Sequence, residues 1–137
     1  MNDNANISYG DPISAPFWEA AARRELMIQR CRCCASYQFY ARPFCILCDS
    51  DDVEWVAAKG TGTVYSMTTV RRKLLPGFDP PYIVAIVELD EGSRMLTNIT
   101  SKFCRIGSRV RVAWKDRDDA PPLPVFETIE EEHRGKA

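Results

Sequence analysis

Residues 31–48 read CRCCASYQFYARPFCILC and contain two C-x2-C pairs separated by ten residues. Two residues between the sulfurs let each pair form a tight turn whose thiolates point at a common centre, about 2.3 Å away when the ion is zinc. The predicted zinc ligands are Cys31, Cys34, Cys45 and Cys48. Four thiolates leave no open coordination position, so we expect a structural Zn²⁺ ion rather than a catalytic one.

Disulfides and iron are the two alternatives for the same cysteines. Disulfides are typical of small secreted chains, but residues 1–20 lack the basic region, the apolar region and the cleavage site of an export signal. We therefore expect a cytoplasmic protein whose reduced thiols bind metal. Iron bound as in rubredoxin stays open beside zinc, because ligand softness and geometry do not separate the two ions.

Three further side chains have metal-binding or nucleophilic chemistry but are not assigned to a site. Cys33 lies inside the first pair, and a Cys31/Cys33 pairing is an alternative with a poorer chelate turn. Cys104 is expected to be a small buried hydrophobic residue, because nothing beside it in sequence lowers a thiol pKa. His133 is the single histidine and lies in a polar tail, where we expect it to be solvated.

Length and composition limit the remaining possibilities. A chain of 137 residues is one domain by size, or a small metal module attached to one modest core. Hydrophobic residues make up 45% of it, which is enough for a packed interior, and no apolar run reaches membrane-spanning length. A net charge of -1 excludes a global attraction to nucleic acid or anionic lipid, so such binding would need a local basic patch.

The predicted fold class is mainly β: a short N-terminal helix plus a zinc ribbon, followed by a five-stranded OB-fold barrel. Residues 16–26 begin with proline and continue with good helix formers, which indicates a short amphipathic helix. The expected organisation is a flexible N-terminus (1–15), helix and zinc ribbon (16–52), OB-fold domain (53–129) and flexible tail (130–137).

From residue 53 onward the pattern is typical of strands. The run 109–115 alternates with period two, which sets Val110, Val112 and Trp114 on one face. A long connector, 101–108, separates the third strand from the fourth, as in a small Greek-key barrel of the OB type. The five expected barrel strands are 63–72, 82–89, 94–100, 109–115 and 123–129.

Five short motifs follow the cysteine ribbon in a specific order. They are VEW (53–55), GTGTVYS (60–66), PPYIVAIVELDEG (80–92), IGSRVRV (106–112) and LPVFE (123–127). With the aromatic helix and the ribbon, this order resembles the acyl-CoA-associated OB-fold proteins with a rubredoxin-like zinc ribbon, the domain of unknown function 35 family. The resemblance covers about residues 16–129. The chain departs from the family at Ala35 and Asp49, which replace the usual glycines, and in a shortened connector at 101–106.

The resemblance implies a non-catalytic, zinc-binding accessory subunit of a thiolase-like enzyme. Such a subunit forms or shields the acyl-CoA site as part of a hetero-oligomer, while the partner carries the catalytic cysteine and histidine. The residues agree with this role, because no Ser/His/Asp or Cys/His set and no Gly-rich phosphate loop is apparent in the sequence.

Two groups of residues are candidates for binding the partner and the CoA. Apolar side chains that cannot be buried internally often mark an interface, although these could instead pack on the chain's own barrel. Basic side chains suit the phosphates of CoA, although they could equally form a solvated charge run. The interface candidates are Phe17, Trp18, Leu74, Leu75 and Phe78, and the CoA candidates are Arg71, Arg72 and Lys73.

Two other functions compete with this interpretation. OB barrels and zinc ribbons also bind nucleic acid, which requires aromatic platforms among basic residues. The strands 82–89 and 94–100 offer only Tyr82 for stacking, which counts against nucleic acid. Electron transfer would require iron, and a red rather than colourless protein would indicate it.

Overall fold

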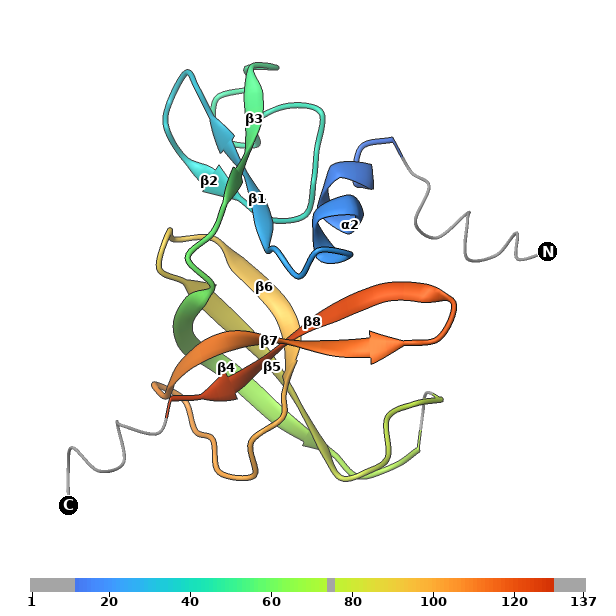
Figure 1. Cartoon of the computed structure of the whole chain (residues 1–137). Coiled ribbons are helices and arrows are strands. Elements are labelled where there is room, and N and C mark those ends of the chain that lie inside the picture. The colour runs from blue at the N-terminus through green and yellow to red at the C-terminus, as the bar shows by residue number, and fades with distance from the viewer. Residues whose placement is uncertain (1–11, 74–75, 130–137) are drawn as a thin grey trace.

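A computed structural model describes residues 12–73 and 76–129. It consists of a helix and a small antiparallel sheet beside a closed five-stranded barrel (Figure 1), so the predicted mainly β fold with one short helix is confirmed. Within these residues, no helix is long and apolar enough to cross a membrane. The elements are α2 (Ala15–Ala21), β1 (Met27–Cys31), β2 (Tyr37–Gln38), β3 (Val53–Ala57), β4 (Thr61–Val70), β5 (Tyr82–Leu89), β6 (Arg94–Ile99), β7 (Arg109–Arg117) and β8 (Ala120–Thr128).

Helix α2 is shorter than the predicted helix over 16–26. It ends at Ala21, and Arg24 has a positive φ of 62°. The N–H of Arg24 donates to the carbonyl of Ala21 at 2.8 Å, and that of Glu25 donates to the carbonyl of Ala20 at 3.0 Å. This pair of bonds ends a helix in a Schellman motif. Glycine usually occupies the left-handed position of that motif, so an arginine there does not signal a helix end in sequence.

The ribbon sheet has β1 at its centre, paired antiparallel with β2 on one side and β3 on the other. Strand β3 begins at Val53, the first residue of the expected OB-fold domain (53–129), yet it pairs along the whole length of β1. The hydrogen bonds of β3 therefore belong to the ribbon, although the expected OB-fold domain included these residues. The barrel itself begins with β4.

The barrel closes in the order β4-β5-β6-β8-β7, with β7 paired to β4. This is the order expected for an OB fold, and the connector 101–108 joins β6 to β7. Strand β8 begins at Ala120, earlier than the predicted 123, and includes Pro121 and Pro122. In this first part β8 pairs with β7 alone, so prolines occupy a strand whose other edge needs no ladder hydrogen bond.

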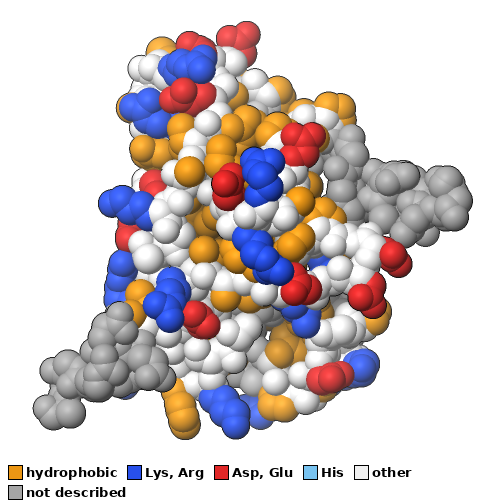
Figure 2. Space-filling view, viewed as in Figure 1, with side chains coloured by type: hydrophobic (Ala, Val, Ile, Leu, Met, Phe, Trp, Pro, Cys, Tyr) orange, Lys and Arg blue, Asp and Glu red, His pale blue; other side chains and the backbone are white. Residues whose placement is uncertain are grey.

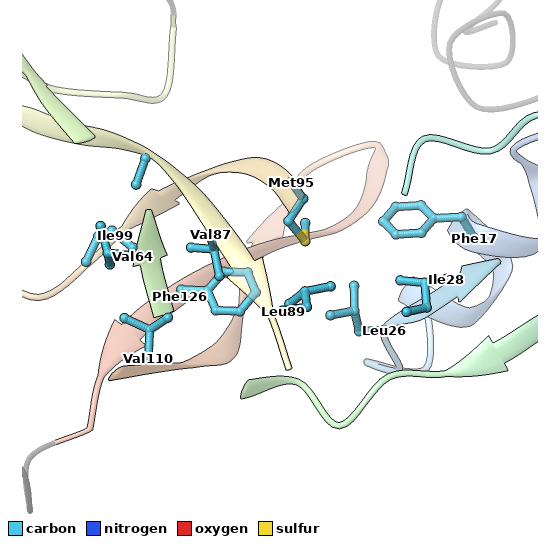
Figure 3. Packing of buried hydrophobic residues seen from close by; sticks show 11 residues of the cluster. Phe17, Leu26, Ile28, Val64, Val87, Leu89, Met95, Ile99, Val110 and Phe126 are labelled. Carbon is cyan, nitrogen blue, oxygen red and sulfur yellow. The ribbon is translucent and has the colours of Figure 1, made fainter. Parts of the chain in front are cut away.

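A single hydrophobic core joins the two parts of the molecule. Figure 3 shows Phe17 and Ile28 on the ribbon side, with Leu26 between them and the barrel residues Leu89 and Met95. The cluster continues through the barrel to Phe126, which is fully buried. Burial of apolar surface stabilises a fold by about 25 cal/mol per Å². The ribbon and the barrel therefore stabilise each other through this shared interior.

The seam between β4 and β7 is held by the turn of the β5–β6 hairpin. Arg109 donates two hydrogen bonds to the carboxylate of Asp90, at 2.8 and 3.0 Å, and the hydroxyl of Thr61 donates to the same group. The guanidinium and this hydroxyl lower the pKa of Asp90 to about 2. Nearby, a Cβ at Gly62 would lie 2.5 Å from the carbonyl oxygen of Glu88, so only glycine allows this close approach of β4 to β5.

Candidate metal centre and basic groove

The structure brings the four predicted ligands together. The Sγ atoms of Cys31, Cys34, Cys45 and Cys48 all lie within 4.8 Å of one another. Those of Cys31 and Cys48 are 3.6 Å apart, and those of Cys34 and Cys45 are 3.7 Å apart. Cys31 and Cys45 are buried, whereas the other two are exposed at the surface of the ribbon.

The two C-x2-C turns, which we call knuckles, have the same backbone geometry. In each one the N–H of the first cysteine donates to the carbonyl of a serine five residues later, Ser36 or Ser50, at 2.8 Å. The residue after the second cysteine has a positive φ, 67° at Ala35 and 68° at Asp49. Both residues thus keep the left-handed backbone that glycine, the usual family residue at these positions, adopts freely.

The sulfur atoms accept several hydrogen bonds from the chain around them. Backbone N–H groups of Cys33 and Cys34 donate to Cys31 Sγ at 3.3 and 3.4 Å, and the N–H of Leu47 donates to Cys45 Sγ at 3.4 Å. The Ser36 hydroxyl lies 3.0 Å from Cys34 Sγ and 3.5 Å from Cys45 Sγ. It lowers the pKa of Cys34, and chiefly through it the pKa of Cys45 falls to about 6.

Cys48 shows why this cluster needs a cation. A backbone hydrogen bond from Ser50 favours its thiolate, but partial desolvation of the sulfur and hydrogen bonds with the neighbouring sulfurs outweigh it and raise the pKa of Cys48 to about 12. Four negative charges this close together repel one another, so without a cation the group keeps protons. A divalent ion removes this penalty, and the closed set of four sulfur donors suits structural zinc. Thiolates also bind iron, so the donor set fits either ion.

The remaining cysteines lie away from the centre. Cys33 is exposed and is not one of the four clustered residues, so the alternative Cys31/Cys33 pairing does not match the geometry. Cys104 packs half-buried against the core, and its burial raises the pKa of its thiol. Both facts agree with the expected hydrophobic role of Cys104.

Two buried glutamines hold the second knuckle against the sheet. The Gln38 amide donates to Oε1 of Gln29 at 2.8 Å and to the carbonyl of Phe44 at 3.1 Å, and its own oxygen accepts the N–H of Ile46 at 3.1 Å. Gln29 in turn exchanges two hydrogen bonds of 2.9 Å with the backbone of Arg42. These amides replace the strand pairing that residues 42–46 lack, and the sequence alone did not reveal them.

The predicted interface residues differ in how far they are buried. Phe17 is only 6% exposed and belongs to the core, so its prediction as a surface residue was wrong: it packs edge-on against Trp18 and Phe39 inside the chain. Trp18 is half-buried, with the guanidinium of Arg117 5.5 Å from its ring centre. Phe78 is half-buried, and Leu74 and Leu75 lie outside the described residues.

The surface also carries large apolar side chains that sequence reasoning did not select. Figure 2 shows hydrophobic side chains gathered over the ribbon half, with acidic and basic ones interspersed across the same face. The second knuckle exposes Phe44, Ile46 and Leu47, the last of them at 74%. The connector after β6 exposes Phe103 and Ile106.

The predicted CoA residues Arg71, Arg72 and Lys73 are all exposed. Lys73 forms an ion pair of 3.1 Å with Asp79. Arg71 lines a groove of about 700 Å³ whose other basic residues are Lys102 and Lys115. We call this the basic groove. Neither of these lysines was predicted, because they lie on the connector and on β7, far from Arg71 in sequence.

An aromatic pair forms one wall of the basic groove. Phe78 and Tyr82 both line it, with ring centres 5.5 Å apart. The Lys115 ammonium lies 5.5 Å from the centre of the Phe78 ring, within the range of a cation–π contact. Cations beside an aromatic wall can bind a phosphate together with a flat ring.

Comparisons with known proteins agree with both parts of the fold. Residues 18–54 match the ChsH2 rubredoxin-like zinc ribbon domain, and residues 55–115 match the ChsH2 C-terminal OB-fold domain. A probable enoyl-CoA hydratase alpha subunit of Thermomonospora curvata is 43% identical over 80% of this chain and 36% of its own length. A 3-oxo-4,17-pregnadiene-20-carboxyl-CoA hydratase alpha subunit of Mycobacterium tuberculosis is 32% identical over 77% of this chain and 35% of its own length. The chain thus spans about a third of these relatives.

Two solved structures share the arrangement. One is a chain of the Ltp2-ChsH2(DUF35) aldolase, which is 38% identical, has a TM-score of 0.78 and aligns over 86% of this chain and 95% of that one. The other is a DUF35-family protein of unknown function from Sulfolobus solfataricus, which is 14% identical, has a TM-score of 0.66 and aligns over 93% of this chain and 95% of that one. The second likeness shows the fold alone.

Proposed function

The chain belongs to the ChsH2 (DUF35) family of zinc-ribbon and OB-fold proteins, and from this premise we propose that it is a non-catalytic accessory subunit of a thiolase-like acyl-CoA enzyme. In this role it forms or shields part of the acyl-CoA site, binds zinc at Cys31, Cys34, Cys45 and Cys48, and works in the cytoplasm as part of a hetero-oligomer. The carbon–carbon chemistry belongs to the partner.

One observation carries the proposal. The alignment with the ChsH2(DUF35) structure extends over both the ribbon and the barrel and includes 95% of that chain. That structure is named as an aldolase of Ltp2 with ChsH2. Because the whole module is shared, rather than the barrel alone, a similar assembly is the simplest role for this chain.

The side chains support a non-catalytic role. Among the described cysteines, four belong to the metal cluster, and burial raises the pKa of Cys104. The remaining one, Cys33, is exposed. A nucleophilic cysteine instead needs a lowered pKa and an adjacent base. The alignments cover only 36% and 35% of the two hydratase subunits, so their activity is not carried over to this chain. Their names do support an acyl-CoA context.

We propose the basic groove as the contact for the nucleotide end of CoA. Arg71 is the predicted residue that lines it, and Lys102 and Lys115 complete a set of cations. Charge-assisted hydrogen bonds to phosphate oxygens suit these groups. Arg72 and Lys73, which are exposed, stay predicted CoA residues.

The partner surface is proposed to combine predicted and newly found apolar residues. Trp18 and Phe78 remain candidates because they are half-buried, and Leu74 and Leu75 remain untested predictions. The exposed knuckle residues Phe44, Ile46 and Leu47 extend this surface onto the ribbon. An apolar patch of this kind is costly to leave in water and is typical of an interface.

Co-expression with a thiolase-like protein encoded nearby tests the proposal. We expect the two proteins to copurify and acyl-CoA turnover to require this chain. A double change of Ile46 and Leu47 to serine should weaken copurification, while a change of Lys59, exposed between the ribbon and the barrel, to alanine should not. No complex, together with activity indifferent to this chain, would rule the proposal out.

The basic groove has its own test in the same complex. Arg71→Ala and Lys102→Ala should raise KM for the acyl-CoA about tenfold with little change in kcat, because they remove binding contacts remote from the reacting bond. Lys59→Ala is the matched control. An unchanged KM in both groove variants would remove CoA binding from this groove while leaving the accessory role intact.

Nucleic-acid binding remains the alternative, and it lacks a specific supporting observation. The exposed ring of Tyr65 on the barrel has the guanidinium of Arg94 3.8 Å from its centre, so a base could not stack on that face without displacing it. Salt-dependent binding to oligonucleotides would revive this alternative.

A further inference from the structure

We propose that Ser36 is a positioning residue of the metal centre, whose hydroxyl donates its one proton to a thiolate of either knuckle and so slows metal loss. The inference rests on the four-cysteine site, but it concerns a residue that is not a ligand. It goes beyond the accessory function, because metal retention can be measured without a partner.

The position of the hydroxyl carries the inference. Ser36 Oγ lies 3.0 Å from Cys34 Sγ, in the first knuckle, and 3.5 Å from Cys45 Sγ, in the second. Metal-bound thiolates can only accept, so the hydroxyl is the donor. Its one proton can turn to either sulfur, so the hydroxyl can form a hydrogen bond with either knuckle.

The charge of the site makes such a donor valuable. Four thiolates around a divalent ion leave a net charge of about -2 on the centre. Hydrogen bonds donated to the sulfurs offset part of this charge and hold the ligands in orientation. They also make the sulfurs less available to protons, oxidants and competing metal binders.

Cys34 is the ligand that depends most on Ser36. Cys31 and Cys45 are buried, and their sulfurs accept backbone N–H groups. Cys34 is exposed, and the hydrogen bonds to its sulfur that act from outside the cysteine cluster come from the hydroxyl and backbone of Ser36. Solvent and chelators reach the exposed sulfurs of Cys34 and Cys48 first, so the hydroxyl acts at one of the two ligands where metal loss would begin.

The second knuckle offers a matched control. Ser50 occupies the position equivalent to Ser36, and its carbonyl makes the equivalent 2.8 Å bond to the first cysteine of its knuckle. Its hydroxyl, however, accepts the N–H of Asp52 at 3.1 Å and is not bonded to a sulfur. Two serines with the same backbone role thus differ in what their hydroxyls contact.

The test compares S36A, S36T and S50A in the full chain by following zinc transfer to a chromophoric chelator. We expect transfer about tenfold faster in S36A, the range found when groups that support metal ligands are removed. S36T keeps the hydroxyl and should retain most of the protection, and S50A should transfer zinc at the wild-type rate. Equal rates in S36A and S50A would overturn the inference.

Cobalt substitution supplies a second measurement that does not depend on affinity. In cobalt-saturated S36A, the thiolate-to-metal charge-transfer band should move to longer wavelength, because a sulfur without its hydrogen bond holds its electrons less tightly. An unshifted band in folded S36A, checked by circular dichroism, would contradict the proposal. If wild-type protein binds no metal at all, the cysteine site itself fails, which is a different outcome from a silent S36A.

Discussion

At the scale of single residues, the chain differs from its family at the residue that follows each knuckle, where it has alanine or aspartate in place of glycine. Ala35 and Asp49 have φ values of 67° and 68°, a region that glycine enters freely. A Cβ there costs about 1 kcal/mol or more for alanine and less for aspartate, which tolerates the region. The two knuckles therefore carry the same geometry at different cost.

Ala35→Gly should stabilise the metal-loaded protein by about 1 kcal/mol, because it relieves the strain at this position. Asp49→Gly should have a smaller effect, since aspartate is better suited to positive φ. Urea unfolding of the three proteins measures the difference. A destabilised Ala35→Gly variant would show that the methyl group makes contacts worth more than the strain.

The metal ligands could be predicted from sequence because their spacing is a local property. The backbone conformation after each knuckle did not follow from the sequence, because Ala35 and Asp49 stand where the family usually has glycine. Ser36 and Lys102 could not be predicted either, since their importance depends on which atoms the fold brings near them. Phe17 was assigned to the surface because a short helix gives no indication of the neighbour that covers it.

At the scale of elements, segments without regular structure are held by particular side chains. The amides of Gln29 and Gln38 hold the second knuckle by hydrogen bonds. The carboxylate of Asp90 holds the barrel seam in the same way. Each of these polar groups is satisfied by its neighbours, so losing one leaves others unpaired.

Gln38→Leu should destabilise the protein by roughly 2–3 kcal/mol, because it leaves the N–H of Ile46 and the carbonyl of Phe44 without their buried partner. It should also speed zinc release, since Cys45 lies between those two residues. Tyr37→Phe, on the same strand, should stay within about 0.5 kcal/mol. Thermal unfolding measures the change in stability, and zinc transfer to a chelator measures the rate of release. A Gln38→Leu protein with unchanged stability would show that water replaces the amide.

Asp90→Asn should destabilise the protein by about 1 kcal/mol at pH 7, allowing for solvent screening of this partly exposed pair. The pKa of Asp90 is lowered to about 2 in the folded protein, against about 3.9 when unfolded. The carboxylate therefore adds stability above pH 4 that is lost as the pH falls toward 2. Wild type and variant should converge over that window in urea unfolding.

The exposed pair of Lys73 and Asp79 provides the control for that measurement. Both side chains are largely in water, so Asp79→Asn should change stability little at any pH. A gap between wild type and Asp90→Asn that persists at pH 2 would mean that the amide disrupts packing rather than charge pairing.

Element boundaries were predicted less well than element types, for reasons visible in particular residues. The helix was predicted too long because Arg24 has a positive φ that ends the helix, and an arginine in the sequence does not indicate this conformation. Residues 53–57 were placed in the expected OB-fold domain because sequence does not show which neighbour a segment pairs with, and they form β3 of the ribbon. Strand β8 was drawn too short because prolines usually end strands, and here they lie where β8 pairs with β7 alone.

At the scale of the whole molecule, the long connector before β7 allowed the order of the barrel strands to be predicted from sequence. The continuity of the core could not be predicted. Leu26 and Leu89 meet across the junction of ribbon and barrel, and nothing in either local pattern indicates that contact. The two parts therefore form one thermodynamic unit, although their sequences look separable.

Metal removal should reveal this coupling. Stripping the metal with a chelator under reducing conditions should lower Tm by roughly 10–20 °C, since the metal contributes several kcal/mol and each 1 kcal/mol shifts Tm by about 4 °C for a chain of this size. We expect the ribbon and the barrel to melt together, because a loosened ribbon uncovers Leu89 and Met95. Calorimetry with and without metal tests this, and a barrel transition unchanged by chelation would contradict it.

The hairpin of β7 and β8 continues past the barrel to helix α2, where Arg117 covers Trp18 and Asp116 forms an ion pair with Arg24. This overhang works as a brace between the two parts. A partner that touched both would meet a preorganised shape and would lose little conformational entropy on assembly. A small contact area would then suffice for binding, and substitutions that loosen the brace would mainly increase the dissociation rate of the complex.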